Sequence, residues 1–192
     1  ARVNFRWFFD YSGGMVTDWG AHHLDIAQWG MGTSLTGPRT VVGKGETKPG
    51  MYETLTSFDV TYTYDNGIPL HFLNGSHGIT FIGDKGEVWV KRGEIRSTPE
   101  DILNEPIRSN DIRLYKSNDH FGNWVECVKS RKKPIADVEI GHRSVTVCHL
   151  ANIACRLGRK LEWDPDAELF VNDSEANDWL DRPMRKPYDY VF

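Results

Sequence analysis

The sequence predicts an α+β fold, in which a mainly antiparallel open sheet carries helices packed on one side. Three observations predict it: helical spacing of apolar residues near the start, apolar and polar residues alternating between turn signals in the centre, and helical spacing again in the last third. Helix, sheet and then helices is an order typical of α+β domains, and no strand–helix–strand unit is repeated. We therefore expect no Rossmann domain in this chain.

The first expected element is a helix from about Gly14 to Gly30. Gly30 and Gly32 favour its end, because glycine readily adopts the left-handed conformation that closes a helix. Gly20 inside it costs about 0.5 to 1 kcal/mol relative to alanine, so we expect another group to approach closely there. Apolar or aromatic residues recur at helical spacing, namely Val16, Trp19, His23, Ile26 and Ala27.

The centre predicts an antiparallel meander of about five or six strands, built from residues of about 39 to 116. Residues 57–64 alternate between apolar and polar side chains, as in a half-buried strand. Asn66-Gly67 is a strong hairpin signal, since both turn positions tolerate positive φ. The same reasoning places turns at Asp84-Lys85-Gly86 and Arg92-Gly93, between strands expected over 79–82, 87–91 and 94–96.

Three helices are expected in the last third. Asp119 can cap the first, which Pro134 stops and which carries Phe121, Trp124, Val125 and Val128 on one face. A longer helix runs from about Ile140 to Leu157, with Gly158 as its left-handed cap. Asp173 is a plausible cap for a short helix that ends near Leu180.

Length and composition describe one water-soluble globular domain over residues 1–192. The 23 Lys and Arg are interspersed with 27 Asp and Glu for a net charge of −4, so no basic surface for nucleic acid is expected. No apolar run approaches the roughly 20 residues that a bilayer requires, so no membrane partner is expected. The three cysteines lack metal or disulfide spacing and are interpreted as buried thiols.

One stripe of the first helix carries the residue types that proton chemistry uses. Asp18, His22, Asp25 and Trp29 follow at i, i+4, i+7 and i+11, within about 60° of one another around the helix axis. An imidazole beside carboxylates supplies a base near neutral pH and acceptors for hydroxyl groups. On spacing alone, Asp18 could equally be a helix cap and His22 a structural residue. A metal site is disfavoured, because His22 and His23 point about 100° apart.

The segment GGMVTDWGAHHLDIAQW resembles the pattern G-G-x-x-x-D-x-G-x-H-x-x-D of the Gfo/Idh/MocA oxidoreductases. Four later segments are similar to the bacterial subgroup with an extended C-terminal domain: FIGDKGEVWVKRGEI, HFGNWVECVKSRKKP, EIGHRSVTVCHLANIACRLGRKLEWDP and DSEANDWLDRPMRKPY. The resemblance covers nearly the whole chain. It implies that residues 1–192 are the substrate-binding and oligomerisation domain of such an enzyme, without its N-terminal dinucleotide-binding domain.

The resemblance also implies roles for particular residues. Asp18 and His22 match the family's catalytic Asp and His, and Asp25 matches an acidic residue near the bound sugar. Gly13 and Gly14 would let the helix start lie beside the nicotinamide. The family's third catalytic group, a lysine of the Rossmann domain, has no counterpart here. We also expect a substrate role for Trp19, His23 and Tyr11. Tyr11 could form an aromatic wall for a sugar face together with Trp7, Phe8 and Phe9, or these four residues could be core.

The expected reaction is hydride transfer between a nicotinamide and a carbon of a sugar or polyol, with Asp18 and His22 in proton transfer. NAD or NADP would bind through the missing N-terminal domain, and this chain alone is expected to bind neither. Two alternatives stay open: a relative that cleaves glycosidic bonds by transient oxidation, and a non-catalytic carbohydrate-binding or oligomerisation domain. A homo-oligomer is expected through a face of the sheet.

Overall fold

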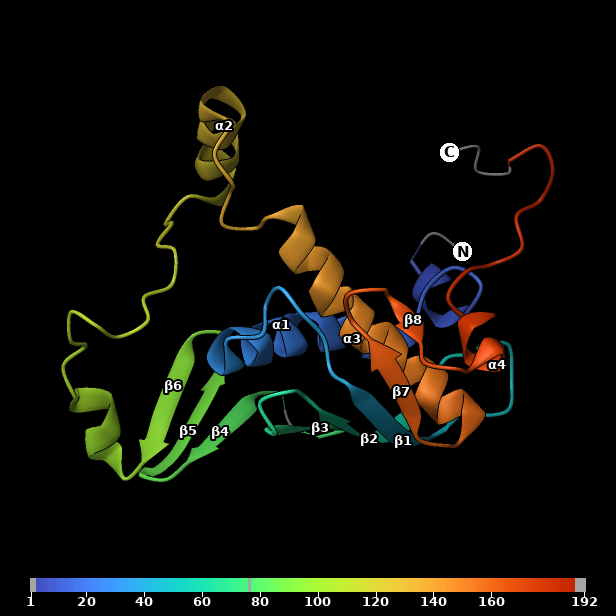
Figure 1. Ribbon diagram of the computed structural model, residues 1–192, viewed down its shortest axis with the longest axis horizontal. Helices are drawn as coiled ribbons and strands as arrows, with labels where there is room; N and C mark the ends of the chain where they lie inside the picture. The colour runs from blue at the N-terminus through green and yellow to red at the C-terminus, as the bar shows by residue number, and fades with distance from the viewer. Residues whose placement is uncertain (1–2, 76, 189–192) are drawn as a thin grey trace.

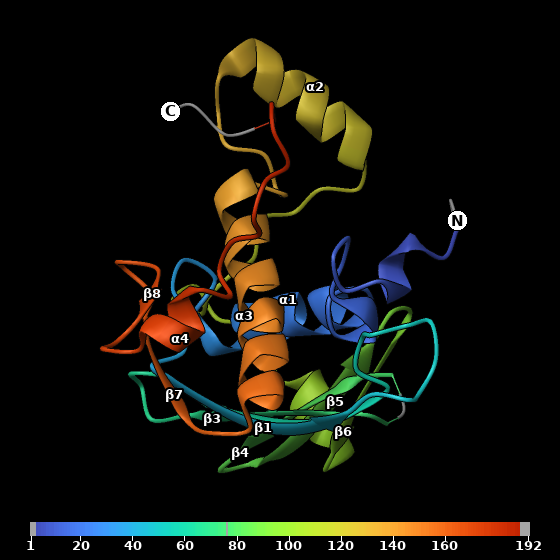
Figure 2. The ribbon, with the colours of Figure 1, turned by 90° about the vertical axis from the view of Figure 1, so that its right-hand side faces the viewer.

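The computed structural model describes residues 3–75 and 77–188. Its strands form one layer, and helices α1 (Trp19–Met31) and α3 (Val138–Leu157) lie together on one side of it (Figure 1, Figure 2). Every strand pairing in the described residues is antiparallel. These features confirm the predicted α+β class with helices packed on an open antiparallel sheet.

A five-stranded sheet forms the larger part of the strand layer, in the order β3-β2-β1-β7-β8. The predicted hairpin at Asn66-Gly67 is confirmed, because Thr63 pairs with Pro69 across it and Gly67 has a φ of 76°. The strands are β1 (Thr40–Glu46), β2 (Ser57–Thr63), β3 (Pro69–Leu73), β7 (Leu161–Asp164) and β8 (Leu169–Phe170).

A separate three-stranded sheet holds β4 (Ile79–Gly83), β5 (Gly86–Lys91) and β6 (Glu94–Thr98), joined by the two predicted turns. The five or six strands expected over residues 39–116 are present as β1 to β6, but the expectation of one meander is wrong in two respects. The strand layer is divided after β3, where the Asn74 side chain accepts from the main-chain N–H of Phe58 in β2 and donates to the carbonyl oxygen of Thr56 just before it. In addition, β7 comes from beyond α3 and pairs with β1 at long range, and β8 pairs with β7, so two strands join the sheet from outside the predicted range.

The first helix begins later than predicted. Gly14–Val16 forms a 3₁₀ turn, η2, and the α-helix starts only at Trp19. Gly14 has a φ of 66°, which a right-handed helix does not accommodate, so the chain cannot enter α1 at this residue. The helix extends to Met31, and Gly32, with a φ of 69°, caps it.

The predicted caps of the later helices are confirmed. Asp119 accepts the main-chain N–H of Gly122 at the start of α2 (His120–Ser130), and Gly158 closes α3. Asp173 caps α4 (Ser174–Asn177), which ends before Leu180. The α2 helix stands away from the strand layer (Figure 1), and its apolar face stays open: Phe121 is 79% and Trp124 59% exposed.

The core lies between the five-stranded sheet and the two helices above it. The Tyr62 hydroxyl group donates to the Val147 carbonyl oxygen at 2.9 Å, which ties β2 to α3. All three cysteines are buried thiols, as predicted, and burial raises the pKa of Cys155 to about 11. Fully buried apolar residues include Val16, Val41, Val60, Tyr62, Val147, Ala151 and Ala154.

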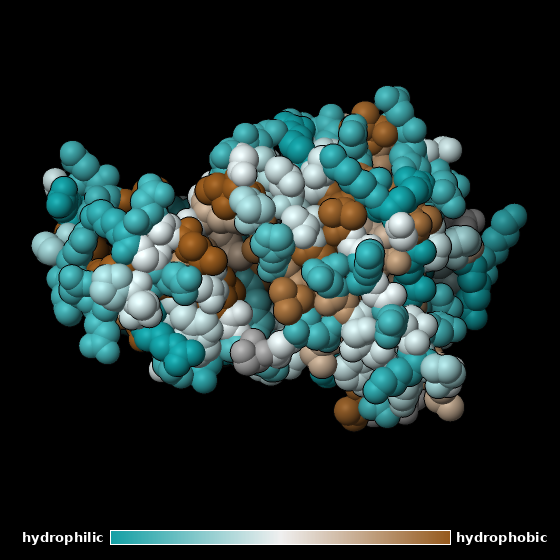
Figure 3. Space-filling view, turned by 90° about the horizontal axis from the view of Figure 1, so that it is seen from below, coloured by the Kyte–Doolittle hydropathy of each residue, from teal (hydrophilic) through white to brown (hydrophobic). Residues whose placement is uncertain are grey.

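The two faces of the larger sheet differ sharply. Phe58, Val60, Tyr62 and Tyr64 are all buried on the helix side, so the chain itself covers that face. The opposite face, seen from below in Figure 3, is open, and it shows hydrophobic residues near its middle with hydrophilic residues around them. Exposed Val42 and Leu73 share it with polar partners in the strand register. The sheet therefore has one uncovered face, whose predicted pairing with another copy stays a prediction.

Candidate functional site

The predicted catalytic aspartate lies at the entrance to α1. Asp18 occupies the N-cap position, but its carboxylate makes no capping hydrogen bond. It accepts instead from Arg6 Nη1 at 2.6 Å, and Arg6 belongs to the 3₁₀ turn η1 (Phe5–Trp7). Both side chains are partly exposed, at 40% for Arg6 and 32% for Asp18. The Asp18 carboxylate is thus held at the surface by a segment that precedes the helix.

The predicted catalytic histidine lies one turn further along the same helix. His22 is exposed, and its Nδ1 atom lies 2.9 Å from Nη2 of Arg92, on the turn between β5 and β6. The Trp19 ring meets the His22 ring edge-on at 5.7 Å, and the Arg92 guanidinium lies 5.8 Å from the Trp19 ring centre. No hydrogen bond joins Asp18 to His22 in the described part of the chain; each of them contacts a different arginine instead.

Two further imidazoles surround Trp19. The His77 ring lies 4.4 Å from the Trp19 ring, and the His23 ring stacks on Trp19 at 6.0 Å. His23 Nδ1 contacts the Trp19 carbonyl oxygen at 3.1 Å. Burial lowers the pKa of His23, with smaller contributions in the same direction from His77 and His22. We call Trp19, His22, His23, His77 and Arg92 the Trp19 cluster.

Two other predicted site residues, Asp25 and Tyr11, face other partners. Asp25 accepts the Ser144 hydroxyl group at 2.6 Å, and Ser144 is buried on α3. One Asp25 oxygen is therefore engaged where α1 meets α3. Tyr11 is 74% exposed, and its ring packs at 6.1 Å from Phe8. The structure thus gathers Trp19, His22 and His23 together, and it gives Asp25 and Tyr11 other contacts.

The glycines of the motif are used by the packing of this chain. Gly13 and Gly14 are buried, and a side chain on Gly13 would collide with Thr17 and Asn152. A side chain on Gly14 would collide with Thr54. At Gly20 the close approach is that of Phe72, whose ring would lie 2.9 Å from an added Cβ atom. These contacts explain all three glycines without a ligand, and the nicotinamide role of Gly13 and Gly14 stays a prediction.

Sequence reasoning missed Arg6, His77, Arg92 and Ser144. The Arg92-Gly93 turn was predicted, but nothing local indicates that it reaches α1, because 70 residues separate Arg92 from His22. Arg6 lies 12 residues before Asp18 in a segment without periodic pattern. Tertiary packing brings these residues to the site, and short-range spacing does not report it.

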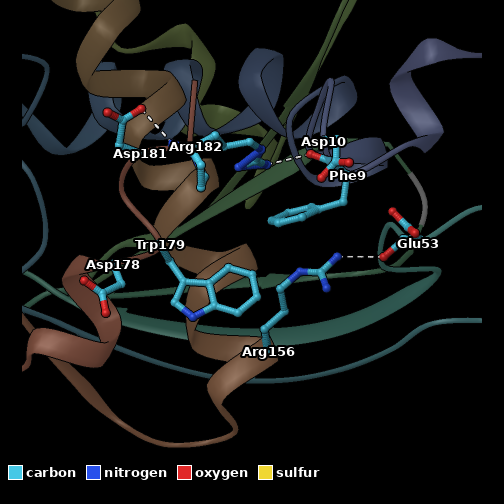
Figure 4. Close-up of a pocket in the computed structure, with 9 residues that line it drawn as sticks. Phe9, Asp10, Glu53, Arg156, Asp178, Trp179, Asp181 and Arg182 are labelled. Carbon is cyan, nitrogen blue, oxygen red and sulfur yellow. Dashed lines mark hydrogen bonds between the residues drawn. The ribbon is translucent and has the colours of Figure 1, made fainter. Parts of the chain in front are cut away.

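An open cleft of about 640 Å³ lies elsewhere, between the start and the end of the chain (Figure 4). Phe9 sits there between two guanidinium groups, with Arg156 at 3.6 Å and Arg182 at 4.4 Å from its ring centre. Burial lowers the pKa of Arg156. The cleft contains neither Asp18 nor His22, and its lining residues are Phe9, Asp10, Glu53, Arg156, Asp178, Trp179, Asp181, Arg182 and Pro183.

Within residues 3–75 and 77–188, no three His, Cys, Asp or Glu side chains gather closely enough to hold a metal ion. In the same residues, no helix is both long and apolar enough to cross a bilayer.

A family model described as the oxidoreductase family, C-terminal alpha/beta domain, of the Gfo/Idh/MocA group matches residues 1–190. A search of the curated proteins finds no match.

Similar solved structures reproduce the fold. The WlbA dehydrogenase from Bordetella pertussis, in complex with NADH and UDP-GlcNAcA, is 17% identical with a TM-score of 0.62; the match covers 85% of this chain and 49% of that one. The WlbA enzyme from Chromobacterium violaceum, with the same ligands, is 18% identical with a TM-score of 0.63; the match covers 83% of this chain and 49% of that one. An oxidoreductase from Agrobacterium radiobacter, in complex with NAD+, L-tartaric acid and magnesium, is 16% identical with a TM-score of 0.54; the match covers 79% of this chain and 49% of that one. The chain thus spans about half the length of these structures.

Proposed function

Because this chain belongs to the Gfo/Idh/MocA oxidoreductase family, as its C-terminal alpha/beta domain, we propose that it is the substrate domain of a nicotinamide-dependent sugar or polyol oxidoreductase. The reaction proposed is hydride transfer between a nicotinamide and a carbohydrate carbon, with Asp18 and His22 acting at the substrate oxygen. The neighbouring WlbA structures, which hold NADH and a nucleotide sugar, support this substrate class.

The observation that carries the proposal is the arrangement at the start of α1. Asp18 and His22 are accessible, and each is held by an arginine from another segment. Trp19 lies beside them with 37% of its surface exposed. An aromatic ring that packs against a sugar, flanked by a carboxylate and an imidazole, can bind a polyol and act on one of its hydroxyl groups. Asp25, Tyr11 and His23 are proposed to lie around the same substrate.

The residues present do not fit the dinucleotide itself. A pyrophosphate needs a glycine-rich turn between a parallel strand and a helix N-terminus, and the described strands are all antiparallel. The space at Gly13 and Gly14 is filled by Thr17, Asn152 and Thr54. We therefore propose that a separate dinucleotide-binding domain holds NAD or NADP, and that this chain binds and orients the carbohydrate.

Calorimetry with NAD and with NADP tests this division of labour. The 192-residue chain should bind neither, whereas the chain joined to a dinucleotide-binding domain should bind at least one. Tight binding by the 192-residue chain alone would show that it contains a dinucleotide site. Absence of binding in both forms would remove the redox function and favour a carbohydrate-binding domain.

A further inference from the structure

The contact between His22 and Arg92 fixes where the imidazole carries its hydrogen. A guanidinium group has five N–H donors and no acceptor, so it can only donate to His22 Nδ1. Nδ1 must then be the unprotonated nitrogen, and the hydrogen of the neutral ring lies on Nε2. We infer that Arg92 is a positioning residue that holds His22 as its Nε2–H tautomer, so that His22 presents a hydrogen-bond donor to the substrate oxygen.

Arg92 is well placed for this task because its hairpin leaves it without a carboxylate partner. Lys91, beside it, pairs with Glu94 at 3.0 Å, and Arg96 packs over Trp89 at 4.0 Å. Among the described residues, Arg92 forms no ion pair, and its one hydrogen bond goes to His22. The two-residue turn with Gly93 at a φ of 77° holds Arg92 at the end of the hairpin, next to α1.

His23 provides an internal reference for the assignment. Its Nδ1 contacts the Trp19 carbonyl oxygen, which can only accept, so Nδ1 of His23 must carry the hydrogen. Two consecutive histidines are thereby held in opposite tautomers, because the partner of His22 is a hydrogen-bond donor and the partner of His23 is an acceptor.

The consequence for the chemistry rests on the proposed function. A neutral imidazole with hydrogen on Nε2 can donate a hydrogen bond from that N–H group to a substrate hydroxyl or carbonyl oxygen and stabilise negative charge that develops there. It cannot accept a proton at the same nitrogen, and its other nitrogen is occupied by Arg92. His22 therefore polarises and orients the substrate oxygen, and the proton acceptor of the reaction is a different group.

Nitrogen NMR of the histidine-labelled chain tests the tautomer directly. At a pH about two units above the ordinary histidine pKa of about 6.5, His22 should show an unprotonated Nδ1 and a protonated Nε2. His23 should show the reverse. In Arg92→Met the His22 signals should move toward those of an imidazole that exchanges between tautomers, and Arg92→Lys, which keeps a donor, should restore them.

Arg96→Met, which removes an arginine from the same hairpin, is the matched control and should leave the His22 signals in place. A protonated Nδ1 on wild-type His22, or unchanged His22 signals in Arg92→Met, would overturn the inference.

Kinetics of the chain joined to its dinucleotide-binding domain separate this inference from the proposed function. Arg92→Met should lower kcat at least about tenfold with a smaller effect on KM, and Arg92→Lys should recover part of it. If His22→Ala abolishes turnover but Arg92→Met does not reduce it, the positioning role is wrong and the proposed function stands. If His22→Ala itself is fully active, the proposed role of His22 fails.

Discussion

His22 and His23 are consecutive on α1, yet the Nδ1 atom of His22 faces a donor, Arg92, and that of His23 faces an acceptor, the Trp19 carbonyl oxygen. The two side chains point in different directions around the helix, as consecutive residues must. His22 is exposed, whereas His23 is half-buried among aromatic rings. His22, which we propose meets the substrate, is thus accessible, and His23 packs against the rings of Trp19 and His77.

The burial of His23 predicts a pH dependence of stability. Because its pKa is lowered chiefly by burial, the unfolded chain binds a proton at this residue more readily than the folded chain. The free energy of unfolding should therefore fall as the pH drops below about 6.5, the unfolded-state pKa. Urea unfolding at pH 7.5 and 5.5 should show a smaller difference in His23→Gln than in wild type. An equal difference in both would assign the pH dependence to other groups.

Two glycine substitutions should have opposite effects on stability. Gly20→Ala places a Cβ atom 2.9 Å from the Phe72 ring, and the overpacking should outweigh the gain in helix propensity, lowering the free energy of unfolding by about 1 to 2 kcal/mol. Gly141 lies in α3, where an added Cβ atom would meet no neighbouring side chain within 4 Å. Gly141→Ala should therefore raise the free energy of unfolding by about 0.5 to 1 kcal/mol. Chemical denaturation of both variants checks the signs; stabilisation by Gly20→Ala would show that Phe72 yields easily.

The Arg6–Asp18 pair should matter more for activity than for stability. Both partners are partly exposed, so Arg6→Met should change the free energy of unfolding by less than about 1 kcal/mol. It should nevertheless lower kcat severalfold, because the Asp18 carboxylate loses the contact that orients it. Arg6→Lys is the charge-preserving control. A large loss of stability with unchanged turnover would make the pair structural.

Much of the fold follows from local chemistry that the sequence displays. The turns at Asn66-Gly67 and Arg92-Gly93 depend on glycines with positive φ, and the cap at Asp119 depends on one side chain and a nearby N–H group. The start of α1 was misplaced because helical spacing was extended through Gly14, whose conformation is not helical. Strands β7 and β8 are not indicated by the sequence because both are short, and β7 joins the sheet through a distant partner, β1.

The candidate site was predicted on one element only. Spacing along α1, with the family resemblance, indicated Asp18 and His22, but their hydrogen-bond partners come from η1 and the β5–β6 turn. Spacing also grouped Asp25 with them, although its described partner is Ser144 on α3. A stripe on one helix shows which residues are neighbours along it, and the other elements decide what each one contacts.

Self-association through the open face of the larger sheet is a further prediction. Val42 and Leu73 are 42% and 57% exposed on this face, among polar residues. Light scattering should show an oligomer that Val42→Arg weakens, with Val138→Arg on the exposed start of α3 as the control. A strict monomer at high concentration would show that this face does not pair.

The measurement that tests the central claim most directly is single-turnover reduction with deuterium on the transferred position of NADH or NADPH, in the chain joined to a dinucleotide-binding domain. Over a panel of oxidised sugars and polyols, we predict that deuterium appears on a carbon of the carbohydrate product. His22→Ala and Asp18→Ala should each slow this transfer by roughly 10²-fold or more, and His142→Ala, on an exposed turn of α3, should not. Absence of deuterium from every product, or transfer at the wild-type rate in both site variants, would contradict the account.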